Sequence, residues 1–520
     1  MSASLLSRIG LEAETTNHRA EEEILLSSSS VRITLPFSPQ LFYRHGWQSW
    51  ALAAWLPPET SPVPISAPEF RTKDEDPLYA LKEKHVSAWV IAVESPSGEV
   101  LLLGALGLGG RIELQENTLH GFYEEGSGDW FLATGEEEQV FARYAEHLAK
   151  RLGRRRIERA PRVWCSWYSL YRLINEQIIL DVLKRLDDLP FDVFQLDDGW
   201  QISTGDWEAN EKFPSGMAAL AEKIRSHGRV AGLWLSPLIV TPDSSIYRNH
   251  PDWLLRGEDG QPVFAGVNWS GKTYALDVTH PAVLEWLEAL IRKVRSWGYE
   301  YLKLDFLYAG ALPGKHARPM PREQAYRQAL ETMRHAAGDA YLLTCGAPVI
   351  PSLGLCDGMR VGPDVTPYWL NHPMSVWLNN PNAPSTQNAI RTSLNRLWLS
   401  SVVHTDPDVI YFRSKTCWMS EEQKTLLRDL GWITGFKATS DLPHWLTSQD
   451  RQRLRQFLET TPVIKRRERH VFEIDGRQVD FRSVMPLPRP HRVPSRLATL
   501  AGLVPMVVNE ILPAWWISRK

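Results

Sequence analysis

The sequence predicts a multidomain protein: a central (β/α)8 TIM barrel, an N-terminal antiparallel β-sandwich and a short C-terminal β region whose completeness the sequence leaves open. Its 520 residues exceed what one hydrophobic core usually supports. Between residues 163 and 445, strand-like runs alternate with amphipathic helical patterns, as parallel βα units do. Residues 30–145 instead carry short apolar runs separated by Gly, Pro and Ser. The predicted domains are residues 1–150, 151–448 and 449–520.

The N-terminal runs are typical of the antiparallel strands of a sandwich. They include SSVRITLPF, VSAWVIAVES and GEVLLLGALGLGG, which are apolar or alternating and are separated by turn residues. Residues 137–160 then have helical periodicity with a basic end. This pattern predicts a helix that connects the sandwich to the barrel.

Eight strand candidates fit a barrel, which needs about 250 residues. In order they are VWCSWYS, VFQLDDGW, VAGLWLSP, YLKLDF, AYLLTCG, GMRVGPDV, LWLSSVVHTDPD and KATSD. Amphipathic segments such as NEQIILDVLKRLDDL and REQAYRQALETMRHAAG lie between them and predict the outer helices. Farther on, HVFEIDGRQVDF contains the Asp475-Gly476 turn of a hairpin over 470–482, whereas the Pro-rich tail from 485 has no strand pattern.

Composition argues against several classes of partner. The formal net charge of -3 leaves no strongly basic domain, so we expect no nucleic-acid partner. No window has the roughly 20 apolar residues of a membrane span, so we expect no membrane partner. The N-terminus meets charge before a signal-peptide core could form, and the four cysteines make neither a disulfide framework nor a zinc spacing. We therefore expect a cytoplasmic protein without metal or cofactor, and a homo-oligomer stays open.

Tryptophan is abundant, with 22 in the chain, and many lie beside turn signals or acidic residues. Core packing accounts for more than half of them. The remainder favour carbohydrate, because sugar rings stack their apolar faces on indole while their hydroxyls reach nearby carboxylates.

The carboxyl ends of the predicted barrel strands are acidic and aromatic. A TIM barrel builds its active site at these ends. One Asp after a strand is commonly a helix cap or turn residue, but many such side chains on one rim indicate a site. The rim residues are Trp164, Trp167, Tyr168, Asp197, Asp198, Trp200, Trp234, Lys303, Asp305, Cys345, Arg360 and Asp364.

The fourth strand, YLKLDF, raises the question of why an apolar strand carries two charges on one face. Alternation sends Leu302, Leu304 and Phe306 toward the helices and the two charges inward. Buried charges need partners, so Lys303 is expected to hold Asp305 ionised, which makes it a good nucleophile. Asp364 is the best second carboxylate for glycoside chemistry. The distance between the two carboxyls, which decides retention or inversion, stays open.

Several motifs resemble the retaining α-galactosidases of glycoside hydrolase family 36, which share a clan with family 27. They are WCSWYS, FQLDDGW, GLWLSP, ALDVTHP, YLKLDF, TCGAP and RVGPDV, together with HGWQSW at 45–50. The resemblance implies hydrolysis of terminal α-galactosyl residues from melibiose- or raffinose-type oligosaccharides, with Asp305 as nucleophile and Asp364 as acid/base. Asp197 and Asp198 match the aspartates that hold the galactose 4- and 6-hydroxyls.

The same resemblance implies further sugar contacts. Trp234 matches a pocket aromatic, and Lys303 and Arg360 match cations that bind hydroxyls and orient the carboxylates. Cys345 would line the subsite, Trp47 and Trp50 would wall the pocket from the N-terminal domain, and Trp167 would be a further contact. HTDPDVIYF resembles the family's seventh-strand segment, whose Asp406 and Asp408 we assign to structure rather than to a metal.

Other functions stay open from the sequence. An α-N-acetylgalactosaminidase or a transglycosylase could use the same fold, and Cys345 is the position to watch for an acetamido group. A Schiff-base aldolase could use Lys303, although an adjacent Asp305 would raise the lysine pKa and oppose it. A sugar-binding protein without catalysis would require one of the two carboxylates to be misaligned.

Overall fold

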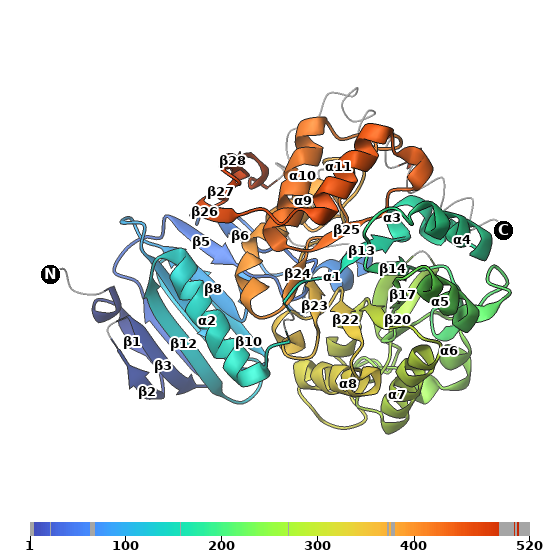
Figure 1. The fold of residues 1–520 in the computed structure, drawn as a ribbon. Coiled ribbons are helices and arrows are strands. Elements are labelled where there is room, and N and C mark those ends of the chain that lie inside the picture. The colour runs from blue at the N-terminus through green and yellow to red at the C-terminus, as the bar shows by residue number, and fades with distance from the viewer. Residues whose placement is uncertain are drawn as a thin grey trace.

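Two antiparallel sheets face each other in the N-terminal part of the computed structural model, beside a barrel of parallel strands (Figure 1). The structure describes residues 5–20, 22–62, 68–155, 158–268, 270–371, 374–375, 380–487, 504 and 507–508. The predicted fold class is confirmed, with both a sandwich and a barrel. Most of the predicted strandless tail lies outside the described residues.

The sandwich consists of a five-stranded and a seven-stranded sheet. The first has the order β1 (Gly10–Glu12), β4 (Ser30–Thr34), β11 (Thr118–Tyr123), β10 (Gly110–Gln115) and β7 (Val86–Ala88). The second has the order β2 (Thr15–Arg19), β3 (Glu23–Ser28), β12 (Gly128–Gly135), β9 (Val100–Ala105), β8 (Val90–Glu94), β5 (Leu41–Arg44) and β6 (Ala54–Leu56).

The seven-stranded sheet is buried on both faces, which explains why β9 has no polar side. Leu101 and Leu103 belong to the core between the two sheets. Val100 and Leu102 point the other way, into a core that continues under α2 (Glu137–Leu152) and through the barrel. The connecting helix was predicted to reach 160 but ends at Gly153, which adopts φ 97°. The N-terminal region and the barrel therefore share one hydrophobic core.

The barrel contains eight parallel strands in chain order, as the alternation predicted. They are β13 (Arg162–Cys165), β14 (Val193–Leu196), β17 (Val230–Leu235), β21 (Tyr301–Leu304), β22 (Tyr341–Thr344), β23 (Gly358–Arg360), β24 (His404–Asp406) and β25 (Lys437–Thr439). β25 pairs with β13, and the chain after β24 meets β25 where the Ile410 N–H donates to the Ala438 carbonyl at 2.8 Å. This contact brings the eighth strand back to the seventh.

Helices cover the outside of the barrel (Figure 1). The helices of this region are α3 (Trp167–Leu170) at the rim of the cavity, α4 (Glu176–Arg185), α5 (Gly216–Ser226), α6 (Ser245–Asn249), α7 (Pro281–Ser296), α8 (Arg322–Ala337), α9 (Thr386–Asn395), α10 (Glu421–Thr434) and α11 (Ser448–Glu459). Two small antiparallel sheets extend the loops: β15 (Gln201–Ser203) with β16 (Asp206–Ala209), and β18 (Ile239–Val240), β20 (Gly271–Ala275) and β19 (Phe264–Asn268). Within the described residues, no helix combines the length and apolar character that crossing a membrane requires.

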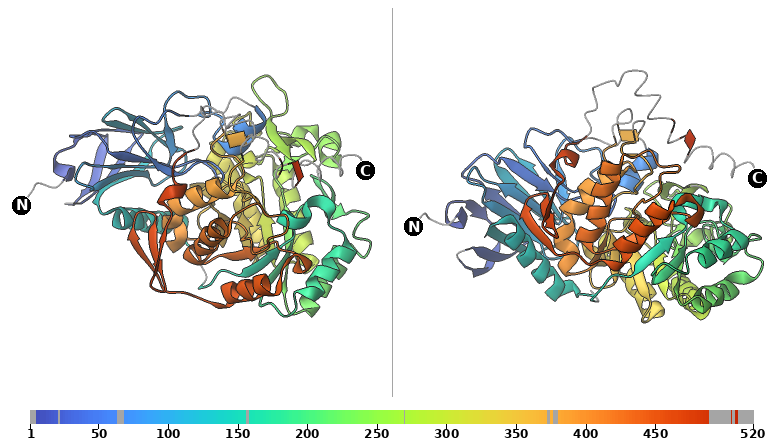
Figure 2. Two further views of the ribbon diagram at one scale, coloured as in Figure 1. Left: turned by 90° about the horizontal axis from the view of Figure 1, so that it is seen from above. Right: turned by 45° about the horizontal axis from the view of Figure 1, so that its top comes forward.

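The C-terminal β region is a three-stranded sheet of β26 (Ile464–Glu468), β27 (Val471–Ile474) and β28 (Arg477–Asp480). The predicted hairpin is β27–β28, and its two turn residues have φ 47° and 83°, as a tight primed turn requires. Figures 1 and 2 place this sheet beside the sandwich and the helices α9 and α10. Ion pairs fix it there, from Arg466 to Glu137 in α2 at 2.6 Å and from Arg477 to Asp429 in α10 at 2.6 Å.

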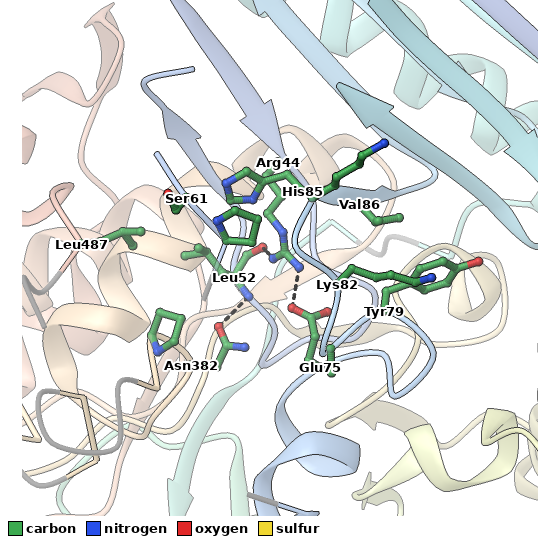
Figure 3. A pocket seen from close by; sticks show the side chains of 14 residues that line it. Arg44, Leu52, Ser61, Glu75, Tyr79, Lys82, His85, Val86, Asn382 and Leu487 are labelled. Carbon is green, nitrogen blue, oxygen red and sulfur yellow. Dashed lines mark hydrogen bonds and ion pairs between the residues drawn. The ribbon is translucent and has the colours of Figure 1, made fainter. Parts of the chain in front are cut away.

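A small cavity of about 50 Å³ lies where the sandwich meets the loop before α9 (Figure 3). The Arg44 guanidinium pairs with Glu75 at 2.5 Å, and the Leu52 N–H donates to the Asn382 side-chain oxygen at 3.0 Å. The ion pair lies within the N-terminal region and the Leu52–Asn382 bond crosses the junction, so we assign this cavity to domain packing. The domain limits at 150 and 448 stay predictions.

Candidate active site

The carboxyl ends of the barrel strands line a cavity of about 270 Å³, a suitable size for a sugar ring. Eight of the predicted site residues line it: Trp50, Trp167, Asp197, Asp198, Trp234, Lys303, Asp305 and Asp364. They come from five barrel strands or the loops that follow them, and from one N-terminal loop. The structure therefore brings together residues that lie up to 314 positions apart, from Trp50 to Asp364.

Strand register places the predicted nucleophile beside a hydrogen-bond donor. Trp234 on β17 lies opposite Lys303 on β21, so both side chains are on the inner face. The Trp234 indole N–H donates to Asp305 Oδ2 at 2.9 Å, and the Phe306 N–H donates to Oδ1 at 2.8 Å. Each carboxylate oxygen keeps a free lone-pair position. Asp305 is thus oriented by two donors and can still attack or accept.

Lys303 was predicted to hold Asp305 ionised; the Asp305 carboxylate does act on the lysine charge, but the direct partner of the lysine is a different carboxylate. Lys303 Nζ instead donates to Asp197 Oδ2 at 2.8 Å, across two strands of the barrel. Both side chains are buried, and burial alone would lower the pKa of Lys303, but the Asp197 carboxylate raises it well above its ordinary value. The spacing along one strand indicated a neighbour, whereas the long lysine side chain reaches the better-placed carboxylate. Lys303 therefore stays protonated.

Asp197 and Asp198 follow β14 directly, and both are buried. Asp197 Oδ2 also accepts from Gln195 Nε2 at 2.8 Å. Asp198 Oδ1 accepts from Gln201 Nε2 at 2.6 Å, and burial raises the pKa of Asp198. Each of these adjacent carboxylates is held by side-chain donors and still has lone pairs that can accept further hydrogen bonds. The pair can therefore accept hydrogen bonds from the hydroxyls of a sugar.

Asp364 differs from Asp305 in its access to water. Its side chain is 34% exposed, whereas Asp305 is 7% exposed. Arg360 at the end of β23 donates from Nη2 to Asp364 Oδ1 at 2.8 Å. A carboxyl that exchanges protons with water needs this exposure, and a nucleophile benefits from burial. The two carboxyls are thus placed in different environments on one cavity.

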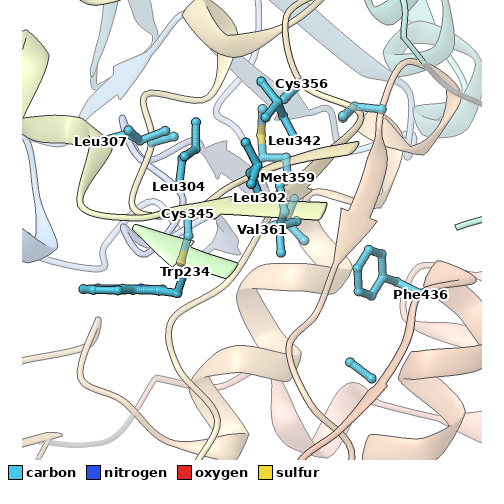
Figure 4. Packing of buried hydrophobic residues seen from close by; sticks show 14 of the residues in the cluster. Trp234, Leu302, Leu304, Leu307, Leu342, Cys345, Cys356, Met359, Val361 and Phe436 are labelled. Carbon is cyan, nitrogen blue, oxygen red and sulfur yellow. The ribbon is translucent and has the colours of Figure 1, made fainter. Parts of the chain in front are cut away.

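Arg360 and Cys345 belong to the layer beneath the cavity rather than to its lining. Arg360 is 1% exposed and reaches the cavity through Asp364 and Tyr168. Figure 4 shows Cys345 on the same side of the strands as Trp234, with Leu302 and Leu304 on the other side. Burial raises the pKa of the Cys345 thiol well above its ordinary value, so it stays protonated.

The assignment of Phe306 to the helix layer is wrong. β21 ends at Leu304, and Phe306 has φ 54°, a left-handed conformation that ends the strand alternation. Its ring lines the cavity and meets Trp50 edge-on, with centroids 5.4 Å apart. The aromatic wall of the cavity therefore includes a residue whose position no strand pattern could predict.

The expected role of Trp47 as a pocket wall is also wrong, while Trp50 from the same loop does line the cavity. Trp47 is 1% exposed and its indole N–H donates to Glu323 in α8 at 3.0 Å. A bridge from Gln48 to Pro348 joins this loop to the segment after β22. Trp47 therefore anchors the loop that presents Trp50.

Buried Arg396, which the sequence analysis missed, organises that loop. Its guanidinium donates to the carbonyls of Gly46 at 3.0 Å, Gln48 at 2.9 Å and Ala51 at 2.9 Å. The same side chain bonds the Val361 carbonyl at 3.0 Å, close to the end of β23. An arginine in an ordinary helical run gives no sequence signal of this function.

The cavity lining contains further residues that the sequence analysis did not name. They are Lys73, Tyr171, Val267, Asn268, Val365, Thr366, Met374 and Pro384. Val365 and Thr366 could have been found because they follow Asp364 directly. Lys73 could not, because it comes from the N-terminal domain and no spacing links it to the barrel.

A TIM barrel with two differently exposed carboxyls on an aromatic, sugar-sized cavity defines a glycoside hydrolase. Residues 131–335 match the family model described as Melibiase. The α-galactosidase TtGalA of Thermus thermophilus is 47% identical with a TM-score of 0.87, over 92% of this chain and 97% of that one. The chain belongs to the α-galactosidases of glycoside hydrolase family 36.

More distant relatives resemble this chain over shorter stretches of sequence or in their fold. The α-galactosidase AgaA of Geobacillus stearothermophilus is 31% identical over 202 residues, which are 37% of this chain and only 27% of that relative's length. A structure of an AgaA variant with raffinose, 18% identical, has a TM-score of 0.60 over 84% of this chain and 63% of that one. At this identity it shows a shared fold alone.

Proposed function

We propose that the protein hydrolyses terminal non-reducing α-D-galactosyl residues of melibiose- and raffinose-type oligosaccharides by a retaining double displacement. The observation that carries the proposal is the orientation of buried Asp305 by two donors on the cavity where Asp364 is partly exposed. Family membership supports the substrate class. The Thermus thermophilus α-galactosidase has been solved in complex with stachyose, an oligosaccharide.

In the first step, a free lone pair of the Asp305 carboxylate attacks the anomeric carbon. Asp364 donates its proton to the glycosidic oxygen as the bond to the leaving group breaks, and a galactosyl ester of Asp305 results. In the second step, Asp364 removes a proton from water, which attacks the same carbon and releases Asp305. The partial exposure of Asp364 supports this role, since a water molecule must reach it.

The proposed sugar contacts divide into acceptors and donors. Asp197 and Asp198 accept from galactose hydroxyls, and Lys303 donates while it holds Asp197 in place. The Trp50 indole nitrogen is buried at the cavity without a hydrogen-bond partner among the described residues. A buried donor without a partner is costly, so we assign it to a hydroxyl of the bound sugar. Trp234 and Trp167 supply apolar walls.

Turnover of p-nitrophenyl α-galactoside by Asp305→Ala tests the nucleophile. We expect the variant to lose activity by about 10⁴-fold or more, as for other covalent nucleophiles. Asp339→Ala, which replaces an aspartate that is 93% exposed, serves as the matched control and should keep full activity. NMR should detect α-galactose as the first-formed anomer, because two inversions retain configuration. Undiminished activity of Asp305→Ala, or β-galactose formed first, would reject this mechanism.

The same assay separates the other functions. Faster turnover of an aryl α-N-acetylgalactosaminide would favour that activity, and binding without turnover would favour a sugar-binding protein. Transfer to an added sugar acceptor would reveal transglycosylation. Borohydride should trap no adduct on Lys303, because its protonated ammonium is held by Asp197 at 2.8 Å and cannot attack a carbonyl.

A further inference from the structure

Asp408, in the segment DPD after the seventh strand, lies beneath the active-site cavity in a strained conformation. β24 ends at Asp406, and Asp408 is 3% exposed with φ 86°. A left-handed backbone is unfavourable for a residue with a side chain, and such strain is concentrated at functional sites. Its carboxylate has no part in the mechanism described above.

The contacts of Asp408 converge on the proposed acid/base. Asp408 Oδ2 accepts from Arg360 Nη2, from the Tyr168 hydroxyl and, at 2.9 Å, from the Val365 N–H. Val365 is the residue after Asp364, and Arg360 is the direct partner of Asp364. Asp408 therefore holds both the backbone and the cation that position Asp364, without touching the cavity itself.

One nitrogen serves both carboxylates: Arg360 Nη2 donates to Asp408 and, at 2.8 Å, to Asp364 Oδ1. We propose that Asp408 is a positioning residue for Asp364, which fixes its direction and takes up enough of the Arg360 charge for Asp364 to hold a proton. This inference rests on the proposed role of Asp364 as general acid. A single uncompensated guanidinium would instead favour the ionised form of Asp364.

The charges around Asp408 predict in which direction a neutral substitution of this residue moves the pH profile. The charged and titratable groups that face Asp408 are Arg360, Tyr168, Asp364, Asp406, Tyr411 and Cys165. Asp364 also faces Asp74 and Cys345. Burial raises the pKa of Asp408, whereas Arg360 lowers it and favours the carboxylate that accepts the three hydrogen bonds. Replacing Asp408 by a neutral side chain leaves the whole Arg360 charge to Asp364. The uncompensated guanidinium stabilises the carboxylate form of Asp364, so the alkaline limb of the pH profile moves to lower pH.

Asp408→Asn, compared on two substrates, tests the inference. p-Nitrophenolate leaves with little protonic assistance, whereas the sugar alkoxide from melibiose needs a proton, and general acids typically contribute about 10²–10⁴-fold. We expect kcat/KM for melibiose to fall at least about ten-fold more than kcat/KM for p-nitrophenyl α-galactoside. The alkaline limb for melibiose should move down by about one pH unit, a shift that a merely structural loss would not cause.

Two further variants make the result decisive. Asp408→Gly removes the carboxylate while its backbone accepts φ 86° more readily, so it tests the inference even where Asp408→Asn folds poorly. Asp441→Asn is the matched control: this aspartate after β25 is 0% exposed and pairs with Arg413 at 3.2 Å, and its loss should affect both substrates equally. Equal losses on both substrates with an unmoved limb in the two Asp408 variants would overturn the inference. Absent turnover by the unmodified protein would instead reject the proposed function.

Discussion

Glu323 accepts four hydrogen bonds from the N-terminal domain, and Glu323→Gln should reveal their contribution to stability. The side chain is 1% exposed in α8. Its Oε1 accepts from Trp47 Nε1 at 3.0 Å and from Arg111 Nη2 at 2.8 Å. Its Oε2 accepts from Trp89 Nε1 at 3.0 Å and from the Gly109 N–H at 2.6 Å. All four donors belong to the N-terminal domain.

The expected loss of stability follows from the replacement of one carboxylate oxygen of Glu323 by an NH₂ group. Glutamine keeps one acceptor oxygen for two of the donors and turns an NH₂ group toward the other two. Each buried donor left without an acceptor costs about 1–3 kcal/mol, so we expect a loss of about 2–6 kcal/mol in the free energy of unfolding. Arg111 keeps ion pairs with Asp76 at 3.0 Å and Glu124 at 3.1 Å, so its charge stays compensated.

Urea unfolding, followed by tryptophan fluorescence and circular dichroism, measures this loss. The control is Glu331→Gln on the same helix, because Glu331 is 53% exposed and pairs with Arg327 at 3.2 Å. An exposed pair contributes about 0–1 kcal/mol. Since Trp47 anchors the loop of Trp50, Glu323→Gln should also raise KM for p-nitrophenyl α-galactoside more than it lowers kcat. Equal stability losses in the two variants would refute the reasoning.

Two other predictions concern single side chains. Trp234→Phe keeps an aromatic ring but removes the 2.9 Å donor to Asp305, so kcat/KM for p-nitrophenyl α-galactoside should fall about 10²-fold; a change below about three-fold would contradict the orienting role. Burial raises the pKa of Asp74 from 3.8 to about 6, so wild-type stability is favoured at low pH and lost as pH rises through about 6. Asp74→Asn removes that loss, and its stability relative to wild type should rise by about 2 kcal/mol between pH 4 and pH 7.5 in urea unfolding. If the free energy of unfolding changed with pH in the same way for both proteins, this prediction for Asp74 would be wrong.

The barrel and the residues of its rim could be predicted from the sequence because both depend on patterns within short segments. Alternating strand and helix patterns identify parallel strands, and parallel strands end at one rim. The sequence therefore predicts Asp197, Asp305 and Asp364 on one site, and all three line the cavity. The bounds of the seventh strand were predicted less well. The predicted run begins with the 3₁₀ helix Leu397–Ser401, and only His404–Asp406 is a strand.

Pairing within the site could not be predicted, because it depends on distances between strands. Spacing along β21 suggested a pair of Lys303 with Asp305, but the lysine reaches Asp197 on β14. Phe306 leaves the strand alternation through its φ of 54°, which nothing in the pattern YLKLDF signals. Side-chain length and backbone reversal thus decide contacts that periodicity leaves open.

Trp47 and Trp50 show that the active-site cavity of the barrel also uses residues of the N-terminal domain. The two residues are three positions apart, yet one is an interdomain anchor and the other lines the cavity. The hydrophobic core that continues from β9 through α2 into the barrel holds the two regions together, and Arg396 fixes the loop on the rim. A barrel without the N-terminal domain would lose the Trp50 wall and the four donors to Glu323. We therefore expect substrate binding to depend on the N-terminal domain as well as on the strand ends.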